Sequence, residues 1–304
     1  RGTKIWMFYE KFIRKAAGMG QASLKPDPDK YEHSHDFCDY LIIGSGPSGI
    51  AAAIKAAEKN LDVILVEQDS KLGGTLLNDP NSNLDDQLYI LKKLGVKIKN
   101  RTTVFGLYDN NIAGLVEKVS DHIANPSKKL PRQRFWTIRS KHIILATGAI
   151  ERHIAFGNND RPGVMTVTAA RSYLNRFAIL PGKNIVIFTN NDSSYLTASE
   201  LSQSGAEVKL FDARDNVDNH LSGETLKSGV GIQMNSAPLK VIGSSTVKKI
   251  QTAVFEGNVW KKGSIVDCDL VLISGGWSPV IHLLSHRGII PSWDEENACF
   301  IGNS

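Results

Sequence analysis

The stretch from residue 39 to residue 67 reads DYLIIGSGPSGIAAAIKAAEKNLDVILVE and leaves few folds open to this chain. It predicts a buried strand over Tyr40–Ile43, a glycine-rich turn, a helix of small residues and a second buried strand that ends at Glu67. These elements in this order, with GxGxxG spacing in the turn, are typical of a dinucleotide pocket. A lone GxGxxG is weak evidence, but here the flanking strands, the helix and the acidic strand end agree with it.

Each glycine of the motif has its own physical role. Gly44 permits the tight turn after the strand, Gly46 lets a pyrophosphate approach the backbone, and Gly49 lets the helix pack against the strand. The helix is expected to start near Pro47 and Ser48, where unpaired N–H groups and the positive end of the helix dipole favour a pyrophosphate. Proline suits this first turn because its missing N–H would have no helical partner there.

Glu67 follows the third glycine by 18 residues and predicts which dinucleotide the pocket accepts. A carboxylate at the end of the second strand can accept hydrogen bonds from both hydroxyls of the adenosine ribose. The same carboxylate would repel a 2′-phosphate, so NADP is disfavoured. FAD and NAD share the ADP half that this motif binds, and the motif alone leaves the choice between them open.

Length and charge exclude several classes of protein. A chain of 304 residues with 41% hydrophobic residues can form about two domains with separate cores. Its net charge of +5, without a long basic run, gives no indication of nucleic-acid binding. No apolar stretch reaches the ~20 residues that cross a bilayer, and no signal peptide precedes the first strand, so a cytoplasmic protein without membrane contact is expected. The chain opens at Arg1 and stops at Ser304, and we expect it to be part of a longer polypeptide.

Cys38, Cys268 and Cys299 are widely spaced and form no CxxC motif. Their spacing indicates neither a zinc site nor a disulfide framework, and it argues against a disulfide reductase. Reduced thiols fit a cytoplasmic location. We interpret His33 and His35 as solvated histidines of a linker and not as metal ligands.

No catalytic dyad is recognisable in the sequence. The histidines that lack a Ser, Cys or carboxylate partner at motif spacing are His122, His142, His153, His282 and His286. The catalytic residues therefore stay unknown, and no metal site is predicted. The i, i+4 spacing of the last two is interpreted as a helix surface near a subunit boundary.

Further elements complete the first unit. Gly73 and Gly74 follow the second strand and predict a flexible turn that can wrap the far side of a bound dinucleotide. The remaining predicted elements are a helix over Asp85–Leu94, a strand over Val96–Val104, antiparallel strands within residues 105–140 and a buried strand that ends in Thr147 and Gly148.

A second strand–helix–strand unit begins at Gly182, about 145 residues after the first. Its segments KNIVIFTN, NDSSYLTASELSQSG and AEVKLFDAR predict a strand, a helix and a strand. Where a nucleotide loop would have its glycines, the sequence reads TNNDSS, with side chains at positions where a phosphate needs bare backbone. Nucleotide binding by this second unit is therefore not expected.

The two units predict an α/β fold with two Rossmann-like dinucleotide-binding domains of the flavoprotein disulfide reductase type, the second inserted into the first. Residues 4–17 predict an aromatic, basic helix, which we interpret as docking on a domain or partner and not on a membrane. The strand in CDLVLISGGWSP, residues 268–279, is assigned to the return into the first domain. The predicted parts are an N-terminal helix and linker over residues 1–37, a discontinuous FAD/NAD(P)-binding domain over residues 38–155 plus 267–304, and the second domain over residues 156–266.

Several segments resemble the alpha subunit of heterotetrameric sarcosine oxidase. They are RTTVFGLYDNN, LPRQRFWTIRSKHIILATGAIERHIAF, NNDRPGVM, the glycine-less FTNNDSSY, and SGGWSPVIHLLSH followed by WDE. The leading RKAAGMG and PDPDKYEH extend the resemblance over nearly the whole chain.

The resemblance implies a complex that oxidises the N-methyl group of sarcosine with oxygen as acceptor. Its products are glycine, hydrogen peroxide and, with tetrahydrofolate, methylene-tetrahydrofolate. It implies FAD on the beta subunit, FMN at the alpha/beta boundary and NAD in the GxGxxG pocket, where the NAD is not the known hydride acceptor. Partners would be beta, gamma and delta subunits. Alpha subunits of this family also carry a folate-binding region and a ferredoxin-like domain, neither of which is present in this sequence, so this chain alone is not expected to carry the folate step. Because it also has no CxxC motif, no acid/base constellation and no glycines in the second nucleotide loop, it is expected to be inactive by itself.

The resemblance also assigns positions within the cofactor site. It places Ser48 beside the pyrophosphate, Thr75 after the double glycine and Val104 near the adenine, with Glu67 and the two residues after it along the adenosine ribose. The complete predicted cofactor site is Gly44, Gly46, Ser48, Gly49, Glu67, Gln68, Asp69, Gly74, Thr75, Val104, Thr147 and Gly148.

Three other functions stay open at this point. A self-sufficient NADH-dependent oxidoreductase would hold FAD at Gly44–Gly49 and NADH in the second domain, which the sequence TNNDSS argues against. A non-catalytic scaffold with a vestigial pocket is disfavoured by the intact glycines and Glu67. Alpha-type subunits of other amine or amino-acid dehydrogenase complexes, such as octopine oxidase or cyanide-forming glycine dehydrogenase, share the pattern, so the substrate is left open.

Overall fold

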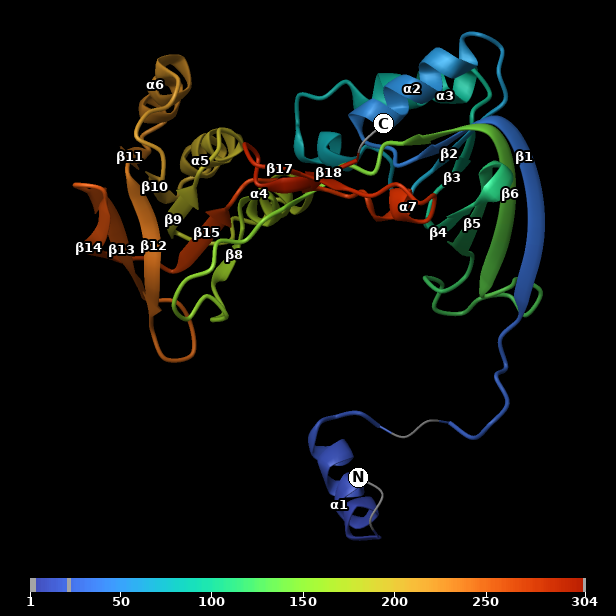
Figure 1. Cartoon of the computed structure of the whole chain (residues 1–304), viewed down its shortest axis with the longest axis horizontal. Helices are drawn as coiled ribbons and strands as arrows, with labels where there is room; N and C mark the ends of the chain where they lie inside the picture. The colour runs from blue at the N-terminus through green and yellow to red at the C-terminus, as the bar shows by residue number, and fades with distance from the viewer. Residues whose placement is uncertain (1–3, 21–22, 303–304) are drawn as a thin grey trace.

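The computed structural model describes residues 4–20 and 23–302, and its first unit is built on a six-stranded sheet (Figure 1). The strands are β1 (Tyr31–Ile43), β2 (Val63–Val66), β3 (Lys97–Lys99), β4 (Thr102–Tyr108), β5 (Ile112–Lys118) and β6 (Gln133–Leu145). They lie in the order β3-β2-β1-β6-β5-β4. β3, β2, β1 and β6 are parallel, and β5 and β4 extend the sheet in antiparallel pairing as the sequence predicts.

Both faces of this sheet are covered near the carboxyl end of β1. Helices α2 (Pro47–Ala57) and α3 (Leu84–Lys93) lie on one face, where Ile42 packs in one buried cluster with Ile50 and Ala53. On the other face Leu41 and Ile43 pack in a second cluster that β4, β5 and β6 share. Burial on both faces explains why the end of β1 is a continuous apolar run.

The first half of β1 corrects the prediction of a linker that extends to residue 37. Residues from Tyr31 onward form a strand that pairs with β6 along its whole length. Cross-strand contacts stabilise it: Arg134 Nε donates to Glu32 Oε2 at 2.7 Å, and the rings of His33 and Phe135 lie 5.3 Å apart. His33 and His35 are therefore strand residues, and no cluster of three or more potential metal ligands occurs within residues 4–20 and 23–302.

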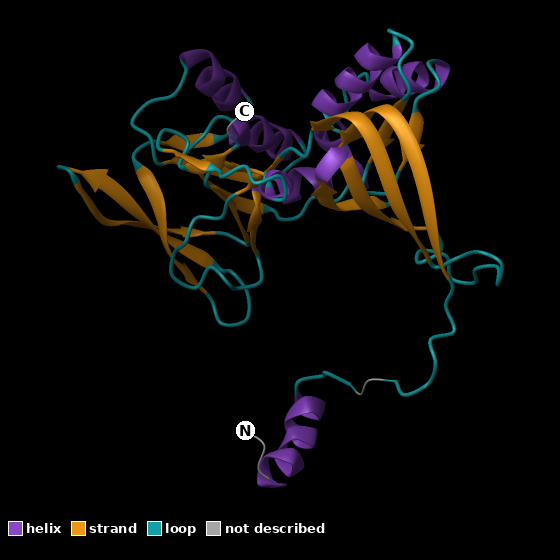
Figure 2. Cartoon of the chain, turned by 45° about the vertical axis from the view of Figure 1, so that its right-hand side comes forward, coloured by secondary structure: helices purple, strands orange, loops and turns teal. Residues whose placement is uncertain are grey.

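The second unit contains a five-stranded parallel sheet in the order β11-β10-β9-β15-β8. Its strands are β8 (Val164–Thr166), β9 (Asn184–Thr189), β10 (Glu207–Asp212), β11 (Gly231–Gln233) and β15 (Leu270–Ser274), and its helices are α4 (Val167–Phe177), α5 (Ser193–Gln203) and α6 (Asn219–Lys227). An antiparallel sheet of β12 (Ser236–Ile242), β13 (Lys249–Glu256) and β14 (Val259–Asp267) completes the unit (Figure 2). The strand–helix–strand repeat predicted from residues 183–214 corresponds to β9, α5 and β10.

The second unit is inserted into the first, but the boundary predicted at residue 267 is wrong for one strand. Strand β15 lies between β9 and β8 of the second sheet, and it does not return to the first unit. The return begins after Ser274, where β16 (Trp277–Pro279) pairs with β7 (Ala149–Glu151). Helix α7 (His282–Ser285) then places Leu283 in the core of the first unit. The hairpin of β17 (Ser292–Asp294) and β18 (Cys299–Ile301) follows.

Helix α1 (Lys4–Ala16) lies apart from both units at the end of an extended segment (Figures 1 and 2). Its large apolar side chains from Ile5 to Ile13 are exposed, as a helix that docks on something else would require. Among the described residues, no helix is long and apolar enough to cross a membrane. Seven residues lie outside the described part of the chain. They are residues 1–3, 21 and 22 of the predicted helix and linker, and residues 303 and 304 of the predicted FAD/NAD(P)-binding domain.

Candidate dinucleotide-binding site

The loop between β1 and α2 is a close-packed glycine turn. Gly44 has a φ of +101°, in the region that favours glycine. A Cβ on Gly44 would collide with the carbonyl oxygen of Ala146 in the segment after β6, and a Cβ on Gly49 would collide with the carbonyl oxygen of Gly44. These two glycines therefore permit the turn and the tight packing of the helix on the strand.

Gly46 leaves open space that the protein itself does not fill. It is the N-cap residue of α2, with an ordinary φ of −68°, and a Cβ built on it would meet nothing within 4 Å. No side chain caps the helix, Pro47 is its first residue, and Ser48 is exposed on the same turn. The backbone N–H groups of this turn therefore lie beside open space at the positive end of the helix, which suits a phosphate.

The Glu67 carboxylate directly follows β2 and is held by the same loop. Its Oε2 atom accepts hydrogen bonds from Ser45 N at 3.0 Å and Ser45 Oγ at 2.5 Å, and its Oε1 atom accepts one from Asp69 N at 2.9 Å. Glu67 is only 8% exposed. Sequence reasoning anticipated this carboxylate but missed Ser45. The available signal was a polar residue between two motif glycines, directly after a buried strand.

The double glycine after β2 packs against the motif loop. Gly73 N donates to Ser45 O at 3.0 Å, and a Cβ on Gly74 would lie 2.9 Å from the Cα atom of Gly46. Gly74 has a φ of +52° and opens a 3₁₀ helix over Gly74–Asn78, in which Thr75 is exposed. The predicted turn is therefore present, and it lies beside the open space at Gly46.

The other predicted site residues divide into two groups. Gln68 and Asp69 are exposed beside Glu67, so their side chains can reach a ligand there. Val104 lies in β4 with its side chain in the buried core, so only its backbone is available for an adenine. The predicted strand over residues 96–104 is interrupted at Asn100 and Arg101, between β3 and β4, and Val104 lies inside β4.

Thr147 and Gly148 lie at the carboxyl end of β6, next to the glycine turn. Ala146 N donates to Ile43 O at 2.8 Å, which holds the two segments side by side. The Thr147 hydroxyl donates to Val280 O at 2.6 Å, and Val280 N donates to Gly148 O at 3.0 Å. These two residues therefore connect the first unit to the returning chain, and they leave the acceptor capacity of the Thr147 hydroxyl for a ligand.

The corresponding loop of the second unit is filled by its own side chains. Asn191 Nδ2 donates to Ser274 Oγ at 3.0 Å, Ser193 Oγ donates to Asn191 Oδ1 at 2.5 Å, and Trp277 Nε1 donates to Ser193 Oγ at 3.2 Å. Because these groups bond one another where a phosphate would need backbone N–H groups, the loop is satisfied without a nucleotide.

The acidic strand end of the second unit is satisfied as well. Asp212 is the last residue of β10 and is fully buried. It accepts hydrogen bonds from Tyr195 Oη at 2.8 Å and from Arg214 Nη2 at 2.8 Å. Burial and the neighbouring Asp212 raise the pKa of Tyr195 well above its usual range, so the phenol keeps its proton and remains a donor.

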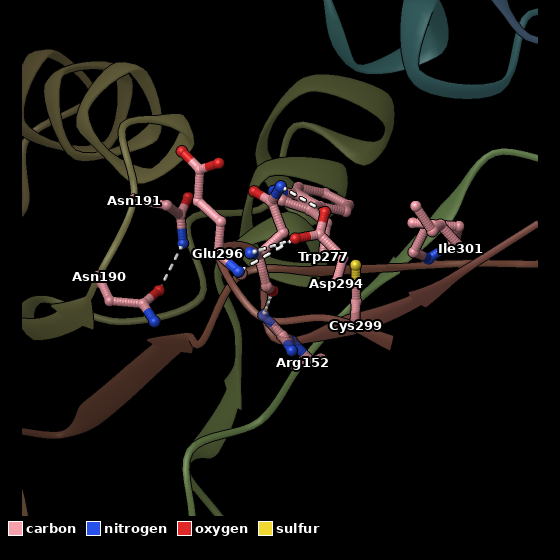
Figure 3. A pocket seen from close by; sticks show the side chains of 11 residues that line it. Arg152, Asn190, Asn191, Trp277, Asp294, Glu296, Cys299 and Ile301 are labelled. Carbon is pink, nitrogen blue, oxygen red and sulfur yellow. Dashed lines mark hydrogen bonds between the residues drawn. The ribbon is translucent and has the colours of Figure 1, made fainter. Parts of the chain in front are cut away.

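Two cavities lie at the crossover between the units and not at the glycine loop. One, of about 390 Å³, is lined by Asn190, Arg152, Trp277 and the β17–β18 hairpin (Figure 3). The other is a more apolar groove of about 830 Å³ beside α7 and the same hairpin. Arg152 Nη2 donates to Asn297 O at 3.0 Å and so fastens the hairpin to the crossover. At the glycine loop, by contrast, the uncapped N-terminus of α2 borders open space at Gly46, a geometry that fits a pyrophosphate.

The cysteines offer no redox pair. All three described cysteines are buried and free. Burial raises the pKa of the Cys38 and Cys268 thiols to about 12, so neither forms a thiolate near neutral pH. The described cysteines therefore provide no thiol–disulfide pair that could carry electrons.

Comparison with known proteins identifies the family of the chain. The family model described as pyridine nucleotide-disulphide oxidoreductase matches residues 38–296. Sarcosine oxidase subunit alpha of Rhizobium meliloti (strain 1021) is 39% identical over 310 residues, which cover 98% of this chain and 30% of the relative. Sarcosine oxidase subunit alpha of Corynebacterium sp. (strain U-96) is 34% identical over 94% of this chain and 31% of the relative. The chain thus spans about 30% of the length of these relatives.

Among solved structures, thioredoxin reductase of Lactococcus lactis is similar in fold. The two superpose with a TM-score of 0.64 over 88% of this chain and 85% of that protein, at 19% identity. At this identity the similarity concerns the fold alone. It agrees with the predicted architecture of two Rossmann-like units, the second inserted into the first.

Proposed function

Since the chain belongs to the pyridine nucleotide-disulphide oxidoreductase family, we propose that it is the dinucleotide-binding region of an oxidoreductase subunit of the sarcosine oxidase alpha type. In this proposal NAD lies with its pyrophosphate over Gly46 and with its adenosine ribose at Glu67. The observation that carries the proposal is the open space at Gly46, beside an uncapped helix N-terminus and the double-glycine turn.

The residues of the first unit would bind and orient this dinucleotide. Backbone N–H groups of the first turn of α2 would meet the pyrophosphate, which needs no cationic side chain because the helix end is already positive. The Oε1 atom of Glu67 would accept a ribose hydroxyl, and the negative charge of Glu67 would repel a 2′-phosphate. NAD carries a hydride when it acts as a redox cofactor. Here we propose a tightly held, mainly structural NAD.

The filled second unit disfavours a self-sufficient flavoenzyme. Such an enzyme would need NADH in the second unit and FAD in the first. Asn191 and Ser193 occupy the phosphate loop of the second unit with their mutual hydrogen bond, and Tyr195 and Arg214 occupy its acidic strand end. A nucleotide there would have to displace the Asn191 and Ser193 side chains, and its ribose would have to displace a donor from the fully buried Asp212 carboxylate, at a cost of about 1 to 3 kcal/mol.

The identity of the cofactor is tested by releasing it from the purified protein with heat. We expect NAD, identified by its mass and by an absorbance spectrum without flavin bands. A released FAD would contradict the NAD assignment but would leave the site in place. Protein that neither retains nor binds any dinucleotide would contradict the site itself.

Replacement of Glu67 by alanine is expected to weaken dinucleotide retention and to leave the fold intact. A hydrogen bond to a charged group is worth about 1.5 to 3 kcal/mol, so the affinity should fall roughly 10- to 150-fold. The measurement is cofactor occupancy of parent and Glu67→Ala after identical dialysis, with circular dichroism as the control for folding. Equal occupancy in the two proteins would remove Glu67 from the site.

Dependence on partners follows from the missing redox groups. The described residues offer no reactive cysteine pair, and the second nucleotide loop is filled, so electrons have no evident route from an amine to oxygen within this chain. We expect no sarcosine-dependent peroxide from the isolated chain loaded with FAD, FMN or NAD in turn. We expect activity when a complete alpha subunit is assembled with flavin-bearing partners. Turnover by the chain alone in a peroxide assay would favour the self-sufficient enzyme.

A further inference from the structure

Ser45 occupies a special position in the loop of the first unit. It stands between Gly44 and Gly46, and its side chain is completely buried, although a serine hydroxyl prefers water. Both of its donors, the backbone N–H and the hydroxyl, bond the same Oε2 atom of Glu67, at 3.0 and 2.5 Å. The loop between β1 and α2 therefore bonds only the Oε2 atom of the carboxylate.

Because Ser45 bonds only Oε2, an acceptor position on Oε1 is left for a ligand. A carboxylate offers about four acceptor positions, two on each oxygen. Ser45 takes both positions on Oε2, and Asp69 N takes one on Oε1 at 2.9 Å. One acceptor position stays on Oε1, and the orientation of that oxygen is set by the contact of Ser45 with Oε2.

We propose that Ser45 is a positioning residue of the dinucleotide site, which fixes the Glu67 carboxylate so that Oε1 meets the adenosine ribose. The inference rests on the proposed dinucleotide function of the loop. It adds a specific residue to that function, because binding strength should depend on a buried hydroxyl that does not itself touch the ligand.

A purely structural role for Ser45 has to be separated from this one. Gly73 N donates to Ser45 O at 3.0 Å and also to Ser45 Oγ at 3.3 Å, so Ser45 connects the motif loop to the double-glycine turn. Loosening that connection would weaken any ligand of the loop. Loss of Glu67 positioning would weaken only ligands that carry ribose hydroxyls.

The test uses Ser45→Ala in the full chain with two probes, ADP and 2′,3′-dideoxy-ADP, measured by titration calorimetry. Loss of one charge-assisted hydrogen bond to Glu67 should weaken ADP about tenfold. The dideoxy probe lacks both ribose hydroxyls, so its affinity should change by less than about twofold. Adding Ser45→Ala to Glu67→Ala should change ADP affinity little, because the group to be positioned is gone.

Ser194→Ala is the matched control. Ser194 is an equally buried serine at the start of α5 in the second unit, where its Oγ donates to Thr189 Oγ1 at 2.9 Å. Its removal should lower stability by a similar amount and leave ADP affinity unchanged. If Ser45→Ala does not fold, Ser45→Cys, with a weaker donor of similar shape, should show the same selective loss.

Three results would overturn the proposal. Equal weakening of both probes by Ser45→Ala would assign Ser45 a purely structural role. Additive effects of Ser45→Ala and Glu67→Ala would show that the two residues act independently. Failure of the parent protein to bind either probe would refute the proposed dinucleotide site, a result that is distinct from selective failure of the Ser45 variants.

Discussion

Gly46→Val is expected to abolish dinucleotide binding in a chain that remains folded. A Cβ at Gly46 meets no protein atom within 4 Å, and the residue has an ordinary φ of −68°. The protein can therefore accept the side chain at the cost of a poorer N-cap, which is on the order of 1 kcal/mol. The branched side chain would occupy the space that a pyrophosphate needs to reach the backbone N–H groups of α2. We expect ADP affinity to fall at least about 100-fold, measured by calorimetry.

Two other glycines provide the controls for this experiment. Gly223 in α6 also meets nothing within 4 Å, so Gly223→Val introduces the same side chain far from the site and should leave ADP affinity unchanged. Gly49→Ala should instead unfold the first unit, because its Cβ would collide with the carbonyl oxygen of Gly44. Undiminished ADP binding by folded Gly46→Val would show that the ligand lies elsewhere.

The elements that sequence reasoning predicted correctly are those with local signals. The end of the first strand at Ile43, the glycine turn, the start of the helix at Pro47 and the end of the second strand beside Glu67 are present within one or two residues of the prediction, although the first strand begins earlier, at Tyr31. The helix predicted over Asp85–Leu94 is α3, and the repeat of the second unit is β9, α5 and β10. In each case apolar periodicity, a turn residue and the length of the segment agree, so that no distant part of the chain is needed to decide the structure.

The errors concern elements whose partners are distant in sequence. The first half of β1 is polar and contains no alternation that predicts a strand, yet it pairs with β6, which lies about 100 residues later. Strand β15 is an apolar run that could enter either sheet. It joins the second sheet, where it pairs with β9 on one side and β8 on the other. Sheet partners are set by tertiary packing, which a single sequence does not contain.

The candidate site shows the same division. The glycines and Glu67 were predictable because backbone conformation and charge at fixed spacing determine their roles. The role of Ser45 was not predictable, since it depends on a hydrogen bond from its buried hydroxyl to the carboxylate of Glu67, 22 residues away. The burial of the Val104 side chain depends on the register of β4 against β5, which the sequence does not specify.

The second large effect is expected for Arg214→Met in the second unit. Asp212 is completely buried at the end of β10, and Arg214 is its charged partner, with Nη2 to Oδ2 at 2.8 Å. Arg214 also reaches Asp192 at the start of the filled loop, with Nη1 to Oδ1 at 2.7 Å. Removing one partner of a buried pair costs about 3 to 5 kcal/mol because the other charge stays buried without compensation. Arg214 is partly exposed, so we expect a value of about 3 kcal/mol.

This loss should appear as a lower melting temperature of the second unit, by roughly 10 to 15 °C, because 1 kcal/mol shifts the melting temperature of a unit of this size by roughly 4 °C. Lys209→Met is the control, because Lys209 lies on the same strand and pairs with Glu207 only at the surface, so its effect should stay within about 0.5 kcal/mol. The double variant Asp212→Asn, Arg214→Met removes the buried charge together with its partner and should recover part of the loss. A single variant that melts at the same temperature as the Lys209→Met control would mean that Tyr195 Oη and the backbone N–H of residue 214, which both donate to Asp212, compensate the carboxylate without the guanidinium. The Arg214 guanidinium would then not be needed to compensate Asp212. Only the hydrogen-bonded Asn191 loop would still argue against nucleotide binding by the second unit.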